Sequence, residues 1–123
     1  MPWNVTFHPD TRIIETTFAG LLTPDELKAA VMATLHECHS RDVPLLLADC
    51  SQLQGGHSIV DLYEMASAVA SSAVVGNLRE AVLVPASAVA ADSVRFWETA
   101  AGNRGITVQL FQDRASAVAW LIG

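Results

Sequence analysis

Residues 45–62 read LLLADCSQLQGGHSIVDL, and this stretch decides the fold class of the chain. An apolar run ends at Asp49, a polar loop with two glycines follows, and a helical pattern begins near Ser58. A short apolar run between turn-forming residues is typical of a strand that is buried on both faces. The stretch therefore predicts a parallel strand over residues 44–49, a connecting loop, and a helix from Ser58 to about residue 72.

The same alternation of strand-like and helix-like segments continues in both directions. Trp3 to His8 alternates apolar and polar residues, as a half-buried strand does, and turn residues separate it from a second β-rich run over 13–18. Those two runs predict an antiparallel hairpin that ends at Gly20. The remaining strands are expected at 80–84 and 106–111, and the remaining helices at 24–39, 88–101 and 114–122.

Thr23-Pro24-Asp25-Glu26 is the clearest local signal in the chain. Thr23 can accept from the exposed N–H groups of a first helical turn, and Glu26 can reach back to the Thr23 N–H. Pro24 would occupy the first helical position, where its missing N–H costs nothing. The residues expected on the buried face of this helix are Leu27, Ala30, Val31, Thr34, Leu35 and Cys38.

The other helices carry weaker boundary signals. Ser58 and Asp113 are predicted N-caps, and Gly102 is predicted to follow the helix over 88–101. Asp49 and the pair Gly55-Gly56 are predicted to set the turn before Ser58. The stripe expected to be buried on the helix after Ser58 consists of Ile59, Leu62, Tyr63, Ala66 and Val69.

Strands that alternate with helices imply parallel pairing through crossover connections. The element order is therefore ββαβαβαβα, an α/β fold with an antiparallel hairpin at its start. A chain of 123 residues fits one domain, which we expect to span residues 1–123.

The composition excludes several classes of function. The net charge is −6 and the seven basic residues are scattered, which opposes nonspecific binding to nucleic acid or anionic lipid. No segment has the features of a signal peptide or the length of a membrane span. Cys38 and Cys50 are expected to be free thiols in a reducing compartment. These observations predict a cytoplasmic protein.

Four features occur in a telling order: an opening hairpin, the helix start G-x-x-T-x-x-E-L at residues 20–27, a strand that ends in Asp49, and the closing stretch VQLFQDRASAVAWL at residues 108–121. Together they make the chain resemble the STAS-like family, the fold of bacterial anti-sigma-factor antagonists such as SpoIIAA, and especially its uncharacterised SpoIIAA-like branch. The resemblance implies a mixed, mostly parallel sheet of four or five strands with helices mainly on one side. It also implies a non-enzymatic regulatory or protein-interaction domain without a cofactor.

In the signalling members of that family, an Asp-Ser-Ser-Gly motif opens the second helix, and a partner kinase phosphorylates its first serine. The matching residues here are His57-Ser58-Ile59-Val60, so only the serine is kept. The resemblance implies a candidate phosphoacceptor or interaction loop that includes Asp49, Ser51, His57 and Ser58. Because the surrounding motif is missing, the residues themselves favour a plain N-cap at Ser58.

The sequence also contains residues that could bind a metal ion or act in catalysis. His36, Cys38, His39, Cys50 and His57 are ligand types that zinc accepts, but helical spacing places Cys38 on the buried stripe and His36 nearly opposite. We therefore expect no metal site. An enzyme that uses Asp49, His57 and Ser58 is a weaker alternative, since the chain has no nucleophile elbow, Walker loop or dinucleotide fingerprint.

Aromatic residues on the helices raise the question of an interface. Phe96 and Trp97 are adjacent and about 100° apart on a helix, so one of them is expected to reach the surface. Tyr63, Phe96 and Trp97 are the candidate interface residues, and the small residues between 65 and 75 allow close approach of a second helix. We expect a homodimer on these grounds. A binding module for a small apolar ligand, held between helices and sheet, is the alternative function.

Overall fold

The computed structural model describes residues 2–71 and 77–123. Its elements follow the predicted order ββαβαβαβα. They are β1 (Trp3–His8), β2 (Ile13–Gly20), α1 (Pro24–Arg41), β3 (Leu45–Leu53), α2 (Ile59–Ala70), β4 (Arg79–Leu83), α3 (Ala88–Gly102), β5 (Thr107–Phe111) and α4 (Arg114–Ile122). Position 72, where the second helix was predicted to end, lies outside the described residues.

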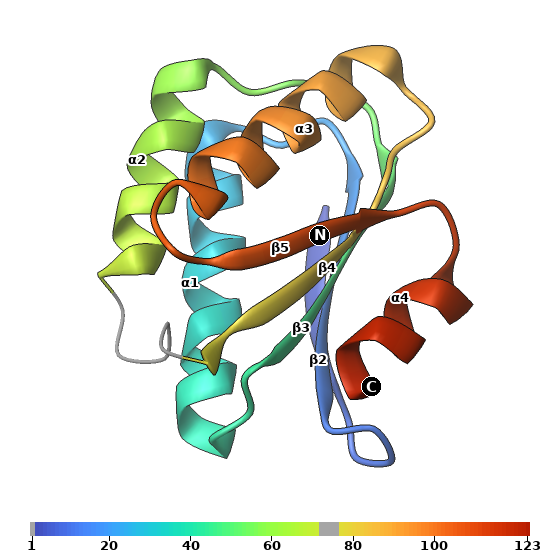
Figure 1. The fold of residues 1–123 in the computed structure, drawn as a ribbon. Coiled ribbons are helices and arrows are strands. Elements are labelled where there is room, and N and C mark those ends of the chain that lie inside the picture. The colour runs from blue at the N-terminus through green and yellow to red at the C-terminus, as the bar shows by residue number, and fades with distance from the viewer. Residues whose placement is uncertain (1, 72–76) are drawn as a thin grey trace.

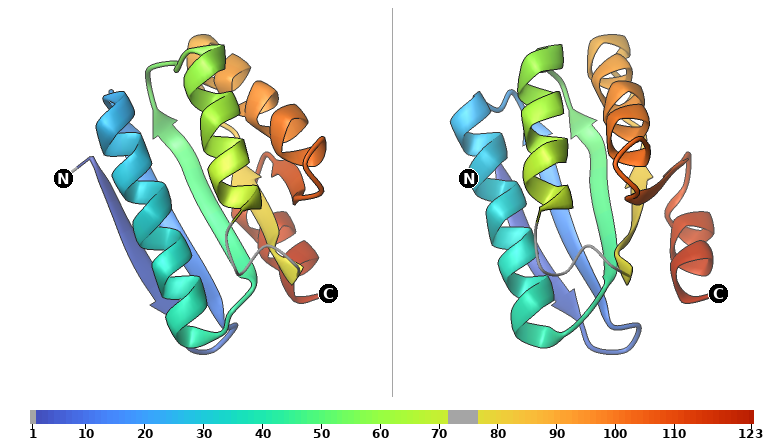
Figure 2. Two further views of the ribbon diagram at one scale, coloured as in Figure 1. Left: turned by 90° about the vertical axis from the view of Figure 1, so that its left-hand side faces the viewer. Right: turned by 60° about the vertical axis from the view of Figure 1, so that its left-hand side comes forward.

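The five strands form one sheet in the order β1-β2-β3-β4-β5 (Figure 1). The pair β1–β2 is antiparallel, and the three following pairs are parallel. Each parallel step moves in the same direction across the sheet, so crossovers of one hand place α1, α2 and α3 on the same face. Figure 2 shows these three helices side by side over that face, with α4 on the other side of the sheet.

The two faces of the sheet hold separate parts of the core. Alternate residues point to opposite faces of a strand. On β2, Ile14 packs beneath α1 while Ile13 packs against α4. On β3, Leu47 shares the α4 cluster with Ala117 and Leu121. We call the two sides the three-helix face and the α4 face.

Side-chain capping explains where the helices begin. At α1 the predicted capping box is present: the Thr23 N–H donates to Glu26 Oε1 at 2.8 Å, and the Glu26 N–H donates to Thr23 Oγ1 at 3.1 Å. Ser58 caps α2 and Asp113 caps α4, as predicted, and Ser87 caps α3. Each cap satisfies an N–H group of the first turn that has no partner within the helix.

Two boundary predictions were wrong. β3 continues to Leu53, so Asp49 lies inside the strand and not at its end. The predicted left-handed glycine after α3 is also misplaced, since Gly102 is the last helical residue and Gly105 has the positive φ of 81°. Three more residues, ending in that glycine, complete the turn into β5.

The strand extension carries a β-bulge. Thr17 pairs with Asp49 and Ala19 pairs with Gln52, so β3 has one more residue than β2 between these pairs. Asp49 Oδ1 accepts from the Ser51 N–H at 3.0 Å and from the Ser51 hydroxyl at 2.6 Å. The Asp49 side chain was predicted to hold its own local backbone. It does so within a bulged strand, because the bulge takes the Ser51 N–H out of the ladder.

Candidate functional site

The loop 54–58 joins β3 to α2 and lies at the carboxyl ends of the parallel strands. Its two glycines are needed for space and not for a special turn, since neither has a positive φ. A Cβ on Gly55 would lie 2.6 Å from a methyl of Leu21, and a Cβ on Gly56 would lie 2.9 Å from a methyl of Val89. The loop is therefore held closely between the end of β2 and the start of α3.

His57 connects this loop by hydrogen bonds to α3 and to the segment after β2. Its backbone N–H donates to Ser93 Oγ on α3 at 2.9 Å, and its ring Nε2 lies 3.1 Å from the Leu22 carbonyl oxygen, which accepts. Ser87 adds a third tie, with its hydroxyl donating to the Gln54 carbonyl at 3.0 Å. These bonds give His57 a structural role in positioning the start of α2.

Ser58 is exposed, and its hydroxyl accepts from the Asp61 N–H at 3.1 Å. This is the geometry of an N-cap. Asp61 lies in the first turn, where a negative charge interacts favourably with the helix dipole. The start of α2 thus already carries the Asp61 carboxylate. A phosphate on Ser58 would add further negative charge beside it.

Exposed apolar side chains surround this loop. Leu21 is 75% exposed, Ile59 65%, Val60 64% and Val89 63%. Leu21 and Val89 flank the two glycines, and Ile59 and Val60 open α2. We call these four residues the apolar rim. Ile59 and Tyr63 were predicted to lie on the buried stripe of α2, and the structure corrects this: both are exposed, and Leu62, Ala66 and Val69 face inward.

Asp49 and Ser51 do not join His57 and Ser58. Asp49 is two residues after Leu47, which packs under α4, so the Asp49 side chain belongs to the α4 face. Hydrogen bonding to Glu15 raises the pKa of Arg114 on α4, and the charge of Asp49 adds to this effect. His57 instead lies on the three-helix face. Asp49 and His57 therefore lie on opposite faces of the sheet, and the structure does not bring together the three residues of the weaker enzyme alternative.

The cysteine and histidine residues do not assemble either. Cys38 is fully buried on α1, whereas His36 and His39 are exposed on the same helix, as the helical spacing predicted. Burial raises the pKa of the Cys38 thiol to about 12 and also raises the pKa of Cys50. Within residues 2–71 and 77–123, no group of three or more His, Cys, Asp or Glu side chains is placed to hold a metal ion.

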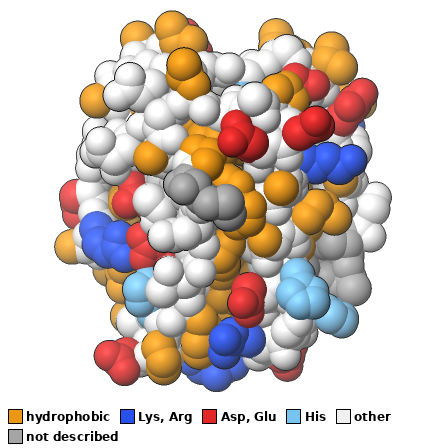
Figure 3. All heavy atoms as spheres, turned by 180° about the vertical axis from the view of Figure 1, so that it is seen from behind, with side chains coloured by type: hydrophobic (Ala, Val, Ile, Leu, Met, Phe, Trp, Pro, Cys, Tyr) orange, Lys and Arg blue, Asp and Glu red, His pale blue; other side chains and the backbone are white. Residues whose placement is uncertain are grey.

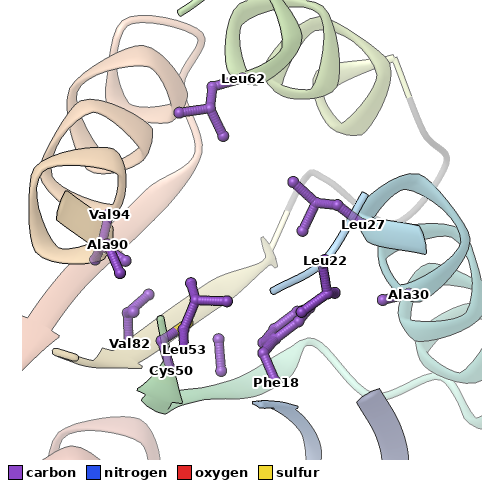
Figure 4. Packing of buried hydrophobic residues seen from close by; sticks show 11 residues of the cluster. Phe18, Leu22, Leu27, Ala30, Cys50, Leu53, Leu62, Val82, Ala90 and Val94 are labelled. Carbon is purple, nitrogen blue, oxygen red and sulfur yellow. The ribbon is translucent and has the colours of Figure 1, made fainter. Parts of the chain in front are cut away.

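A cavity of about 80 Å³ lies between the sheet and the three helices that cover it. Figure 4 shows side chains of this region that reach inward from α1, α2, α3 and the sheet. Most of the wall is apolar, with contributions from Phe18, Leu27, Leu62, Val82 and Val94. A smaller cavity of about 40 Å³ adjoins it and shares several wall residues. Both cavities border a single carboxyl group, that of Glu80.

Glu80 lies on β4, which pairs with β3 on one side and β5 on the other. Its side chain points to the three-helix face. Its Oε1 accepts a hydrogen bond from Trp97 Nε1–H at 2.9 Å. Burial raises the pKa of Glu80 to about 7, and the Trp97 hydrogen bond offsets only part of this rise. Glu80 is only half-buried, which agrees with its place on the walls of both cavities.

The three candidate interface aromatics have different surroundings. Phe96 and Trp97 are both half-buried and pack against core clusters on the three-helix face, so each ring is shared between core and surface. Tyr63 is 53% exposed, and the Arg104 guanidinium stacks 4.1 Å from its ring centre. Part of the predicted interface stretch 65–75 lies outside the described residues.

A shallow groove runs between the edge strand β1 and α1. Its volume is about 430 Å³, and Trp3, Val5 and Ala33 line it together with the polar residues Asn4, His36 and Glu37. Figure 3 shows hydrophobic side chains gathered in a seam on this side of the molecule. The groove is larger and more open to solvent than the cavity beside Glu80.

Comparison with solved structures decides the fold type. An uncharacterised protein of the DUF3478 family from Shewanella loihica PV-4, described as having a SpoIIAA-like fold, superimposes with a TM-score of 0.58 at 17% sequence identity, over 97% of this chain and 91% of that one. The chain has a SpoIIAA-like fold. No family model and no curated protein matches the sequence.

The SpoIIAA-like fold confirms the predicted mixed, mostly parallel sheet with helices mainly on one side. Among the described helices, none is both long and apolar enough to cross a bilayer. In this fold the loop 54–58 lies directly before the second helix, α2.

Glu80 is the residue that the sequence interpretation missed. The sequence signal for it is the acidic residue itself, which interrupts the mostly apolar stretch LREAVLVP at residues 78–85. A charged residue on a central strand is rarely buried without a reason, and that rarity was the available signal.

Proposed function

We propose that the chain is a regulatory protein-interaction domain of the anti-sigma-factor-antagonist type, and that it docks its partner on the apolar rim. The observation that carries this proposal is the clustering of four exposed aliphatic side chains around a loop that hydrogen bonds hold firmly. Protein–protein interfaces bury such apolar centres within a polar margin. The rim also stands at the carboxyl ends of the parallel strands, where open α/β sheets form their sites.

The partner that fits this surface is a protein with an apolar contact patch and basic residues around it. Asp25 and Glu26 follow Leu21 at the start of α1, and Asp61 follows Val60. With a net charge of −6, a second copy would bring like charges together, whereas a basic partner would be attracted. We therefore favour a different protein over self-association at the rim, and the predicted homodimer remains a prediction.

Ser58 lies within this surface and is a candidate for regulation by phosphorylation. A phosphate there would place about two negative charges between apolar contact residues and next to Asp61. We infer that modification would weaken docking. A Ser58→Asp variant should lower partner affinity by at least tenfold, and Ser58→Ala should leave affinity within about twofold while costing the helix cap about 1 kcal/mol of stability.

Site-specific photocrosslinking tests the docking surface. A photoreactive amino acid is placed at position 60 in the rim, or at position 122 on α4, where Ile122 is also exposed (56%) and serves as the matched control. The partner crosslinked in cells is then purified, and its affinity is measured for Val60→Glu and Ile122→Glu. Val60→Glu should weaken binding roughly thirtyfold, as expected for a contact worth about 2 kcal/mol, and Ile122→Glu should not.

Equal effects of the two substitutions would contradict docking at the rim. Crosslinks from position 60 to a second copy of the chain would show that the rim forms a homodimer and does not bind a different protein. Sedimentation velocity at high micromolar concentration separates these outcomes, since a monomer under those conditions excludes the homodimer.

A further inference from the structure

The cavity beside Glu80 combines an apolar wall with a carboxyl group that lacks a cationic partner. All seven basic residues lie in the described part of the chain, and none of them pairs with Glu80. The arginines are engaged elsewhere, for example Arg114 with Glu15 and Arg79 with the Trp120 carbonyl, and Lys28 lies in an outer groove. Trp97 supplies the single hydrogen bond to the Glu80 carboxyl group found among residues 2–71 and 77–123, and it reaches only Oε1.

An outer groove leads toward this cavity. It has a volume of about 310 Å³, lies between α1 and α2, and carries three acidic residues and one lysine: Asp25, Asp61, Glu64 and Lys28. Val31 and Met65 line both the groove and the inner cavity, so these two side chains separate them. Methionine is flexible and adapts its shape at low cost, which suits a side chain at an entrance. The excess of acidic groups in the groove favours an approaching cation.

We propose that this cavity binds a primary alkylammonium group, with the ammonium on the Glu80 carboxylate and the alkyl chain against the apolar wall, entered between Val31 and Met65. The carboxylate supplies the acceptors that an ammonium needs, and the wall supplies apolar contact for the methylenes. The cavity has a volume of about 80 Å³, against about 310 Å³ for the outer groove, so only a short chain fits inside.

Other groups near Glu80 do not provide the missing charge. Cys38 on α1 and Cys50 on β3 are close enough for Glu80 to raise their thiol pKa values, and both thiols are neutral near pH 7. His57 lines the same cavity from the loop, but its Nε2 is bonded to the Leu22 carbonyl. The helix α3 contributes Trp97 and Ser93. An incoming ammonium is therefore the natural counterion for Glu80.

The test uses three probes of similar shape: n-butylammonium, 1-butanol and butyrate. Binding is followed by NMR, with the Trp97 indole N–H as the reporter because it bonds Glu80 directly. We expect n-butylammonium to bind with a millimolar dissociation constant, the scale that ligand efficiency sets for five non-hydrogen atoms. Its affinity should rise about tenfold from pH 6 to pH 8 as Glu80 ionises, while 1-butanol shows no such rise and butyrate does not bind.

Variants locate the effect. Glu80→Gln keeps an acceptor for Trp97 and should abolish the preference for n-butylammonium over 1-butanol. Glu37→Gln makes the same chemical change on the outer side of α1 and should leave binding unchanged, and His57→Gln should keep the pH dependence. The proposal is overturned if n-butylammonium shifts only residues of the outer groove, or if its affinity equals that of 1-butanol at both pH values in the unmodified protein.

A lysine side chain of a partner protein carries the same end group as a free amine. Nα-acetyl-lysine methylamide therefore serves as a fourth probe. Tighter binding of this probe than of n-butylammonium would assign the site to a lysine side chain, because its backbone would contact the outer groove. Weaker binding would assign the site to a free small amine, and failure of both to bind would refute the site.

Discussion

Two glutamates stand on the same sheet and face opposite layers of the molecule. Glu15 on β2 points to the α4 face, where Arg114 donates to both of its oxygens, to Oε2 at 2.9 Å, and His8 Nε2 lies 2.7 Å from Oε1. Glu80 on β4 points to the three-helix face and has one neutral donor, Trp97. Burial acts on both carboxyl groups, but the outcome differs because only one of them has a cation.

The pKa values record this difference. Burial alone would raise the pKa of Glu15, but hydrogen bonds from Arg114 and His8 outweigh it and the pKa is lowered. Burial raises the pKa of Glu80 to about 7, since Trp97 compensates for only part of the lost hydration. A buried acid with its cation in place is part of the architecture, whereas a half-buried acid that lines a cavity and has no cation is a candidate for binding one.

The largest expected effect comes from Glu80→Gln. The folded pKa of about 7 lies above the ordinary value of 4.5, so between these pH values the unfolded chain loses a proton that the folded protein keeps. Stability contributed by this group is therefore lost as the pH rises from about 4.5 to 7, on the order of 3 kcal/mol in all. Urea unfolding should show the variant more stable than the original protein by up to that amount at pH 8, and nearly equal to it at pH 4.5.

Glu37→Gln is the matched control and should leave this pH profile unchanged. If Glu80→Gln were destabilised at pH 8, the Glu80 carboxylate would have stabilising partners in the folded chain that make up for its lost hydration. That result would remove the contrast with Glu15.

Arg114→Met tests the other side of the comparison. Glu15 would stay buried with His8 as its remaining partner, so we expect a loss of about 1–3 kcal/mol at pH 7, measured by urea unfolding. Because a lowered folded pKa contributes stability that disappears as the pH falls below the ordinary value, the effect of the substitution should shrink at pH 3. Arg95→Met removes an exposed pair with Asp92 and should change stability by less than about 1 kcal/mol.

The smallest effect is expected for His8→Gln. The His8 side chain is 41% exposed and Gln can still donate to Glu15, so solvent and Arg114 would replace most of what is lost. Stability at pH 7 should change by less than about 0.5 kcal/mol. A loss as large as that of Arg114→Met would show that His8, and not Arg114, holds the Glu15 charge.

Local signals in the sequence predicted much of the fold. The capping box at Thr23 and the caps at Ser58 and Asp113 are made by side chains within three residues of the N–H groups they satisfy, so the sequence contains both partners. The element order and the parallel pairing were also accessible, because alternating strands and helices permit few topologies. The position of the loop 54–58 followed from these elements.

Features that depend on contacts between distant segments were not predictable in the same way. Asp49 was expected to end its strand, but pairing with β2 extends the strand and creates the bulge. Phe96 and Trp97 both pack inward because of where α3 sits on the sheet. Glu80 gains its importance from a cavity whose walls come from three helices and three strands, which no single stretch of sequence describes.

The contrast between the two glutamates is tested most directly by an NMR titration of their side-chain carboxyl carbons, with and without n-butylammonium. We predict that Glu80 titrates near pH 7 in the free protein and at a lower pH when n-butylammonium is bound, while Glu15 titrates below its ordinary value in both samples. A Glu80 midpoint near 4.5 in the free protein, or one that n-butylammonium does not lower, would contradict the assignment of Glu80 as an unpartnered ligand group.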